Sequence, residues 1–179
     1  MSMDEQELVR QIQEGDEMAF TEIVKTYKNK IVNYLYQLTG NYQKAVDLSQ
    51  ETFMRVFFKA HKYKPIAPFS SWIFAIASNL AKTELKKAQR VSIVYLDDLH
   101  NSHKRGAFVE NPYDSGLTRN IKQALNSLHP RYRIPVVLKD MEGFSLEEIA
   151  QILKRPVGTI KARISRGRNY LKIELEKAL

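Results

Sequence analysis

The stretch that decides the fold lies near the carboxyl end, where residues 145–171 read SLEEIAQILKRPVGTIKARISRGRNYL. Ser145, followed three residues later by Glu148, forms a capping-box pattern that predicts the start of a helix. The Lys-Arg-Pro run at 154–156 ends this helix, because proline removes a backbone donor and clashes with the preceding turn. A second helix is expected to begin near Val157. The pattern therefore predicts two short helices joined by a tight turn.

The second of these helices has two contrasting faces when its residues are placed at 100° intervals. Its apolar face must pack on the core, and its opposite face carries small and polar side chains with cations on both sides. Arginine reads guanine edges in the major groove of DNA, and flanking cations bind phosphates. The pattern predicts a DNA-recognition helix, the alternative being an ordinary basic surface helix of a bundle. The inner face holds Ile160, Ile164, Gly167 and Leu171, the outer face Ala162, Ser165, Arg166 and Asn169, and the rim Lys161, Arg163 and Arg168.

Composition sets limits on the class of protein. The 179 residues suffice for one medium domain or two small ones, and 44% hydrophobic content is enough to form packed cores. The absence of cysteine excludes disulfides and cysteine-based zinc sites and fits a reducing compartment. The first residues, MSMDEQELVRQ, are acidic and polar rather than a signal peptide, and no apolar run approaches the roughly 20 residues of a membrane span. We expect a cytoplasmic protein with no direct membrane insertion.

Positive charge is concentrated in two zones of a chain whose net charge is +8. Residues 61–95 contain six Lys and Arg against one Asp or Glu, and residues 118–179 contain 13 against six. The segment between them, 96–117, contains two against four. Two basic zones separated by an acidic stretch suggest a polyanion held at two places.

Helical periods dominate the whole chain and predict an all-α fold. We expect a helix over 4–14, a second capped by Asp16 and stopped by Gly40, a third capped by Asn41, and a fourth capped by Ser70 or Ser71 that ends near 89. Helices resume over 118–127 and 130–142. Residues 93–116 lack a sustained period. The predicted architecture is two small helical domains, 1–92 and 117–179, joined by a flexible linker over 93–116, the second being a helix-turn-helix domain of four helices.

The fourth expected helix carries a second candidate DNA surface. Its partly polar face places the only tryptophan of the chain near an amide and two ammonium groups. Aromatic side chains stack on single-stranded bases, which stabilises binding by about 1–3 kcal/mol per base. The alternative is that the tryptophan only anchors the helix to its neighbours, because tryptophan is usually well buried. The candidate residues are Trp72, Asn79, Lys82, Thr83 and Lys86.

Both halves resemble one protein family. PVGTIKARISRGRNYLK, preceded by LHPRYRIPVVLKDMEGFSLEEIA, resembles the carboxy-terminal domain of bacterial sigma factors of the extracytoplasmic-function (ECF) group, which reads the upstream, minus-thirty-five promoter element. DLSQETFMRVFFKAHKYKP, followed by FSSWIFAIASNLAKTELKK, resembles their amino-terminal domain, which binds polymerase and melts and reads the downstream, minus-ten element. The resemblance implies an alternative sigma factor that binds core RNA polymerase and directs promoter-specific transcription initiation.

Further roles follow from the resemblance. Asp47, Gln50 and Glu51 match the helix that grips the clamp of the polymerase beta-prime subunit, although such charges are more commonly a solvated helix surface. The loop from Pro65 to Phe69 is expected to form part of a pocket for a flipped base. Promoter DNA and an anti-sigma protein are the other implied partners.

Other chemistry is not expected. We find no pattern of nucleophile and base, no glycine-rich phosphate loop, and no cofactor site. His100 and His103 lack a third ligand for a metal. Pro135 should kink the helix that contains it. A self-sufficient helix-turn-helix regulator with a helical sensing or dimerisation domain remains the alternative, and such a protein would bind duplex sites without polymerase. A nucleic-acid-processing enzyme is disfavoured because acid, base and metal constellations are missing.

Overall fold

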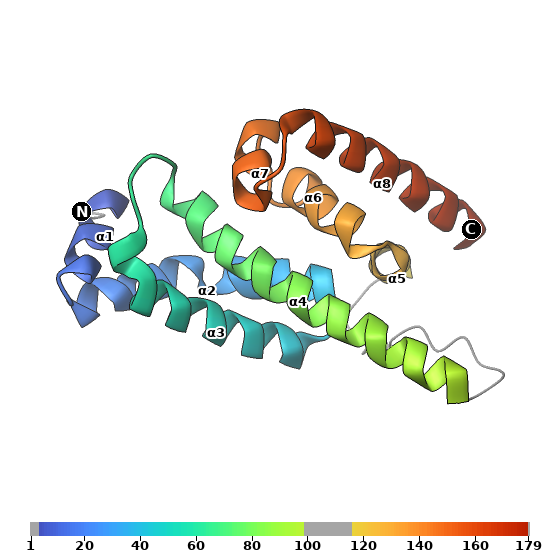
Figure 1. Ribbon diagram of the computed structural model, residues 1–179, viewed down its shortest axis with the longest axis horizontal. Coiled ribbons are helices and arrows are strands. Elements are labelled where there is room, and N and C mark those ends of the chain that lie inside the picture. The colour runs from blue at the N-terminus through green and yellow to red at the C-terminus, as the bar shows by residue number, and fades with distance from the viewer. Residues whose placement is uncertain (1–3, 99–115, 179) are drawn as a thin grey trace.

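The computed structural model describes residues 4–98 and 116–178, and within these ranges the chain is helical with no strand (Figure 1). This confirms the predicted all-α class. The elements are α1 (Glu5–Gln13), α2 (Glu17–Thr39), α3 (Tyr42–Lys59), the short 3-10 helix η1 (Ala60–Lys62), α4 (Phe69–Asp98), α5 (Gly116–Ser127), α6 (Pro130–Asp140), α7 (Leu146–Leu153) and α8 (Val157–Ala178).

Local signals set most of the helix ends. The Asp16 carboxylate accepts hydrogen bonds from the backbone N–H groups of Met18 and Ala19 at 2.8 and 3.1 Å, so it caps α2 as predicted. Gly40 ends α2 with φ of 66°, a conformation that favours glycine. Asn41 then caps α3 through the backbone N–H of Lys44. The three predicted helix ends are therefore confirmed. They could be predicted because each depends only on neighbouring residues.

Helix α4 differs from its prediction at both ends. It begins at Phe69, ahead of Ser70 and Ser71, so neither serine is its cap. Trp72 N–H bonds to the carbonyl of Pro68, which starts the helix one turn earlier. At the other end α4 continues to Asp98, since residues 90–98 contain neither glycine nor proline to stop it.

The amino-terminal half is a bundle in which α2 packs against α1, α3 and α4. The apolar side of α2 faces the interior, with Ile23, Ile31 and Leu35 almost completely buried. A buried polar link within this core joins the hydroxyls of Tyr34 and Ser78 at 2.6 Å. Burial raises the pKa of Tyr34, so this hydroxyl stays protonated.

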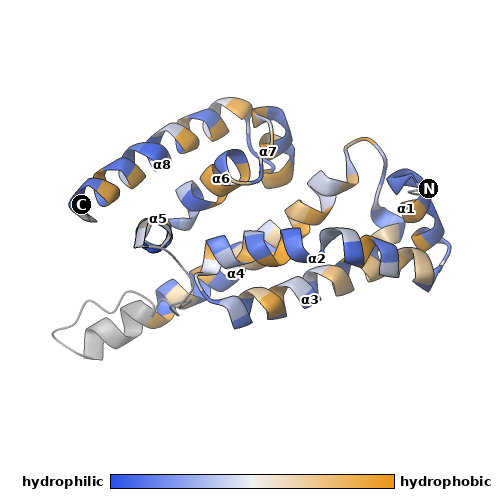
Figure 2. Ribbon diagram, turned by 180° about the vertical axis from the view of Figure 1, so that it is seen from behind, coloured by the Kyte–Doolittle hydropathy of each residue, from blue (hydrophilic) through white to orange (hydrophobic). Residues whose placement is uncertain are grey.

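Helices α5, α6 and α7 pack on α2 and α4, and α8 packs on α5, α6 and α7. Buried side chains of both halves form one apolar cluster. Figure 2 shows where apolar residues lie along α2, α4, α6 and α7, and the buried ones among them belong to this cluster. Phe74 of α4 meets Phe144, which precedes α7, with ring centroids 4.9 Å apart. Pro135 lies buried within α6, which runs on to Asp140.

Arg133 is the principal polar contact between the halves, and its side chain is only 6% exposed. Its guanidinium donates to the Leu38 carbonyl at 2.5 Å and to the carbonyls of Asn126 and Leu128 at 2.5 and 2.8 Å. These carbonyls lie at the carboxyl ends of α2 and α5, where helix dipoles favour a cation. Burial lowers the pKa of Arg133 to about 10, which leaves it charged at neutral pH.

Candidate nucleic-acid interface

The helix-turn-helix predicted from sequence is present as α7, a tight turn and α8. Ser145 and Glu148 form both bonds of the capping box, at 3.1 and 2.7 Å. Lys154 ends α7 in the left-handed region with φ of 50°. A Cβ atom at Gly167 would lie 2.6 Å from Cγ2 of Val136, so glycine allows α8 to approach α6 closely.

The wheel assignment of α8 agrees with the burial of its side chains. Ile160 and Ile164 are buried, and Gly167 is buried between them and Leu171. The predicted outer and rim residues point away from this core, and only Arg163 among them is half-buried. The exposed residues are Lys161, Ala162, Ser165, Arg166, Arg168 and Asn169.

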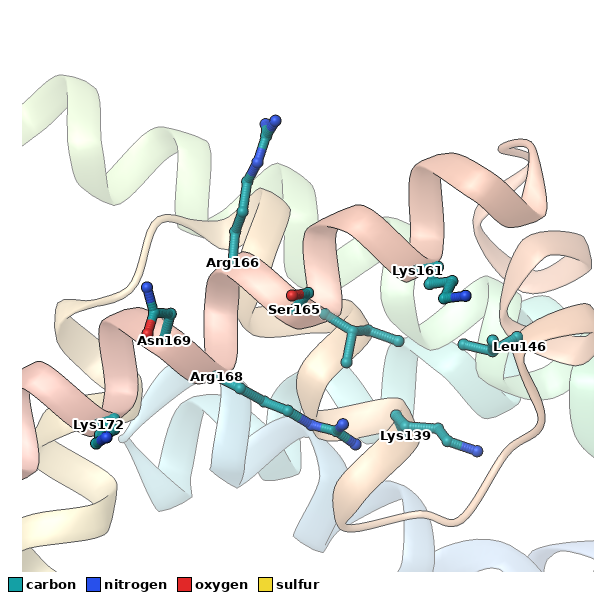
Figure 3. Close-up of a pocket in the computed structure, with 9 residues that line it drawn as sticks. Lys139, Leu146, Lys161, Ser165, Arg166, Arg168, Asn169 and Lys172 are labelled. Carbon is teal, nitrogen blue, oxygen red and sulfur yellow. The ribbon is translucent and has the colours of Figure 1, made fainter.

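A hollow of about 740 Å³ lies along one side of α8 (Figure 3). Its lining joins residues of α8 to Lys139 of α6, and five of the lining side chains are cations. A concave, cationic surface with hydroxyl and amide groups fits a phosphate backbone. Sequence reasoning missed Lys139 and Lys172, because Lys139 lies outside the recognition helix and Lys172 is a turn beyond its predicted outer face. The lining is Lys139, Leu146, Lys161, Ile164, Ser165, Arg166, Arg168, Asn169 and Lys172.

Arg168 is not a free cation in this hollow. Its Nε donates to Oδ2 of Asp140 at 2.9 Å, and its Nη2 donates to Oδ1 of the same carboxylate. This bidentate pair holds α8 to the end of α6 and raises the pKa of Arg168. Figure 3 shows the side chain extended toward Lys139. The Asp140 charge offsets much of the field of Arg168 toward a phosphate.

Arg166 points away from the other labelled cations in Figure 3. It contributes to lowering the pKa of the Tyr132 hydroxyl, a shift caused mainly by the hydrogen bond from Arg131 at 2.7 Å. The pKa of Arg163 is lowered by burial and then by the nearby charges of Arg155 and Arg131. Arg166, at the edge of the hollow, and Arg163 therefore lie near further cations, Arg131 and Arg155, outside the hollow.

We expect Lys161→Ala to reduce the salt dependence of duplex binding more than Arg168→Ala does. Each phosphate contact contributes about 0.9 to the slope of log K against log salt concentration, and Arg168 is already neutralised by Asp140. The measurement is the binding of the polymerase complex to promoter DNA between low and moderate salt. If the slope of log K against log salt concentration fell equally in the two variants, Arg168 would not be neutralised by Asp140 as assigned here.

The second candidate surface lies on α4. Asn79, Lys82, Thr83 and Lys86 are exposed there, as predicted. Trp72 is half-buried, with its ring centroid 5.4 Å from that of Tyr63 and 5.7 Å from that of Phe69. This packing gives Trp72 a structural role beneath the loop that precedes α4, and its contact with bases stays a prediction.

The third candidate surface lies on α3. Asp47 and Gln50 are exposed, whereas Glu51 is half-buried and paired with Arg55 at 2.8 Å. Gln50 also borders an apolar groove of about 640 Å³ between α2 and α3. Sequence patterns could not reveal this groove, because two helices must pack to form it. Its apolar lining is Phe20, Val24, Val32, Tyr42, Val46, Phe53, Met54, Phe57 and Phe58.

Over 4–98 and 116–178, no helix combines the length and hydropathy that crossing a membrane requires. The same residues hold no cluster of three His, Cys, Asp or Glu side chains suited to a metal. His100 and His103 lie outside the described residues.

Comparisons with known proteins match both halves. Residues 23–91 match the family Sigma-70 region 2, and residues 118–171 match Sigma-70, region 4. The chain is 34% identical over 176 residues to the ECF RNA polymerase sigma factor SigW of Bacillus subtilis, covering 93% of this chain and 94% of the relative. It is 30% identical to the RNA polymerase sigma-H factor of Pseudomonas aeruginosa, covering 98% and 95%.

A solved structure agrees with these matches. The sigma factor RpoE in complex with the anti-sigma factor NepR from Bartonella quintana is 28% identical, with a TM-score of 0.70 over 88% of this chain and 96% of that one. Together these findings define the protein as a bacterial transcription initiation factor. The chain belongs to the ECF RNA polymerase sigma factors, and it is an alternative sigma factor that directs promoter-specific initiation by RNA polymerase.

Proposed function

We propose that the sigma factor divides its work between residues 1–92 and 117–179, with 93–116 as the connection. The observation that carries the proposal is the presence of two separate exposed polar and basic helix faces. The face of α8 reads the upstream element, and the face of α4 contacts the strand that is opened at the downstream element. Each face is supported by its own family match.

Polymerase binding is assigned to α3. Asp47 and Gln50 are exposed polar groups on the same helix as Met54 and Phe58, which are 54% and 68% exposed. Exposed apolar side chains beside a groove, with polar groups around them, are typical of a protein interface. The beta-prime clamp is the proposed occupant, and Glu51 acts at its edge.

The remaining proposals concern the cellular setting. An anti-sigma protein is a proposed partner, supported by the structure of the similar RpoE bound to NepR. The protein acts in the cytoplasm, where promoter DNA and polymerase are found. RNA synthesis is carried out by the polymerase, so the sigma factor itself is not an enzyme.

The deciding experiment is run-off transcription with and without core polymerase. We expect promoter-specific transcripts only when both proteins are present, and weak duplex binding by the sigma factor alone. Tight sequence-specific binding by the isolated chain, equal to that of the polymerase complex, would instead favour a self-sufficient regulator.

We expect Arg166→Ala to weaken promoters through the upstream element. Loss of a bidentate base contact costs about 1–3 kcal/mol and relaxes the preference at that base pair. The measurement is binding of the polymerase complex to a set of upstream-element variants. Lys172→Ala, at an exposed cation of the same helix, is the control and should weaken all variants evenly. An unchanged base preference in Arg166→Ala would remove this residue from the reading face.

Asn79→Ala should impair strand opening without affecting polymerase binding, because Asn79 is exposed on α4 whereas the proposed polymerase contacts lie on α3. Asp47→Ala combined with Gln50→Ala should do the reverse. Permanganate reactivity of melted thymines measures opening, and a competition assay with core polymerase measures binding. Loss of polymerase binding in Asn79→Ala would show that the two surfaces have been exchanged.

A further inference from the structure

The loop between η1 and α4, residues 64–68, is fixed at its base by α1, which lies beside it in Figure 1. The Gln13 side chain donates through Nε2 to two backbone carbonyls, that of Ala60 at 2.9 Å and that of Tyr63 at 3.1 Å. The Tyr63 hydroxyl in turn donates to the carbonyl of Ala67 at 2.8 Å. A continuous chain of hydrogen bonds therefore runs from α1 to the far end of the loop.

An aromatic cluster supports the loop from below. The ring of Tyr63 lies 5.6 Å from that of Phe69 and 5.4 Å from that of Trp72, measured between centroids. Tyr27 contacts Phe69 at 5.6 Å and donates its hydroxyl to Glu5 of α1 at 2.5 Å. Helix α1 thus contacts the base of the loop through Gln13. It also contacts the aromatic cluster, because Glu5 accepts the hydrogen bond from Tyr27.

The loop holds an apolar side chain in solvent. Ile66 is 87% exposed at its tip, between Pro65 and Pro68. The two prolines restrict the backbone, and the bonds from Gln13 and Tyr63 fix both ends. An exposed apolar group on a rigid loop fits a partner that presents flat apolar surfaces, and an unstacked base presents such surfaces.

We propose that Gln13 is a positioning residue for promoter opening, which holds the loop so that Ile66 meets a base of the opened strand. This inference rests on the proposed function of α4, whose face contacts the strand that is opened at the downstream element. Gln13 precedes residue 23, where the match to Sigma-70 region 2 begins, so the family match assigns it no role. Its effect on DNA is transmitted entirely through the backbone of the loop.

The test uses the polymerase complex on a promoter that it transcribes in the run-off assay. Gln13→Met removes both donors without adding charge and keeps a good helix former. We expect it to slow open-complex formation about tenfold, since each lost hydrogen bond contributes several-fold. Gln6→Met is the matched control, because Gln6 is exposed on the same helix and its side chain is not bonded to the loop. Polymerase binding should stay unchanged in both.

A double-mutant cycle separates positioning from general destabilisation. In an Ile66→Ala background Gln13→Met should have almost no further effect, because the side chain that it positions is gone. Fully additive effects, normal opening in Gln13→Met, or loss of polymerase binding in that variant would each overturn the assignment of Gln13. Normal opening in Ile66→Ala alone would overturn it together with the proposed role of the loop.

Discussion

Arg133→Met is expected to destabilise the folded protein by about 3–5 kcal/mol. The change leaves three buried carbonyls at the ends of α2 and α5 without their donor, and each unsatisfied group costs about 1–3 kcal/mol. Methionine fills a similar volume, so the loss reports the hydrogen bonds rather than a cavity. Urea denaturation followed by circular dichroism measures the effect.

Arg131→Met is the matched control for this variant. Arg131 lies two residues earlier in the sequence and carries the same charge, but it is exposed and its guanidinium donates to the hydroxyl of Tyr132. Its replacement should change the stability by about 0.5 kcal/mol or less. Equal urea midpoints for the two variants would show that the buried guanidinium of Arg133 contributes no more to the stability than a surface cation does.

Phe144→Ala should release the carboxy-terminal half from α4. Truncation of a buried phenylalanine costs about 3–5 kcal/mol, and Phe144 contacts Phe74 across the interface between the halves. A loss of about 3 kcal/mol in docking lowers the ratio of docked to undocked protein more than a hundredfold. The bond from Arg133 to Leu38 and the remaining apolar contacts between the halves are then too weak to keep most molecules docked.

Energy transfer between two dyes measures this release. The sequence contains no cysteine, so cysteines that replace Lys30 and Glu147 provide unique labelling sites. Lys30 lies near Glu142, and Glu147 is exposed on α7, so the two dyes begin close together. Transfer should fall in Phe144→Ala and stay unchanged in Phe58→Ala, which truncates an exposed phenylalanine of α3. Unchanged transfer in Phe144→Ala would contradict the role of this contact.

The interface between the two halves also contains an acid, Glu142, whose pKa is shifted by its surroundings. Burial raises the pKa of Glu142, and the charge of Lys30 opposes that shift. Glu142 follows the end of α6, and the buried hydroxyl of Tyr34 on α2 senses its charge. The charge of Lys30, on the other half, offsets part of the cost of burying the ionised form of this acid.

The sequence was sufficient to predict the helices and the faces of α8. The capping box at Ser145, the caps at Asp16 and Asn41, and the stop at Gly40 depend on residues within one turn of each other. The period of Ile160 and Ile164 likewise assigns the inner face without knowledge of any partner helix. Such signals are short-range, so they can be read before the chain folds.

Only the tertiary structure revealed which polar groups meet. Arg168 has the sequence position of a free DNA-binding cation, yet it pairs with Asp140, which lies 28 residues earlier. Gln13 and Arg133 look like ordinary polar residues until folding brings them to carbonyls 50 and 95 residues away. The packing of helices from different parts of the chain decides these contacts, because it fixes distances that no local period encodes.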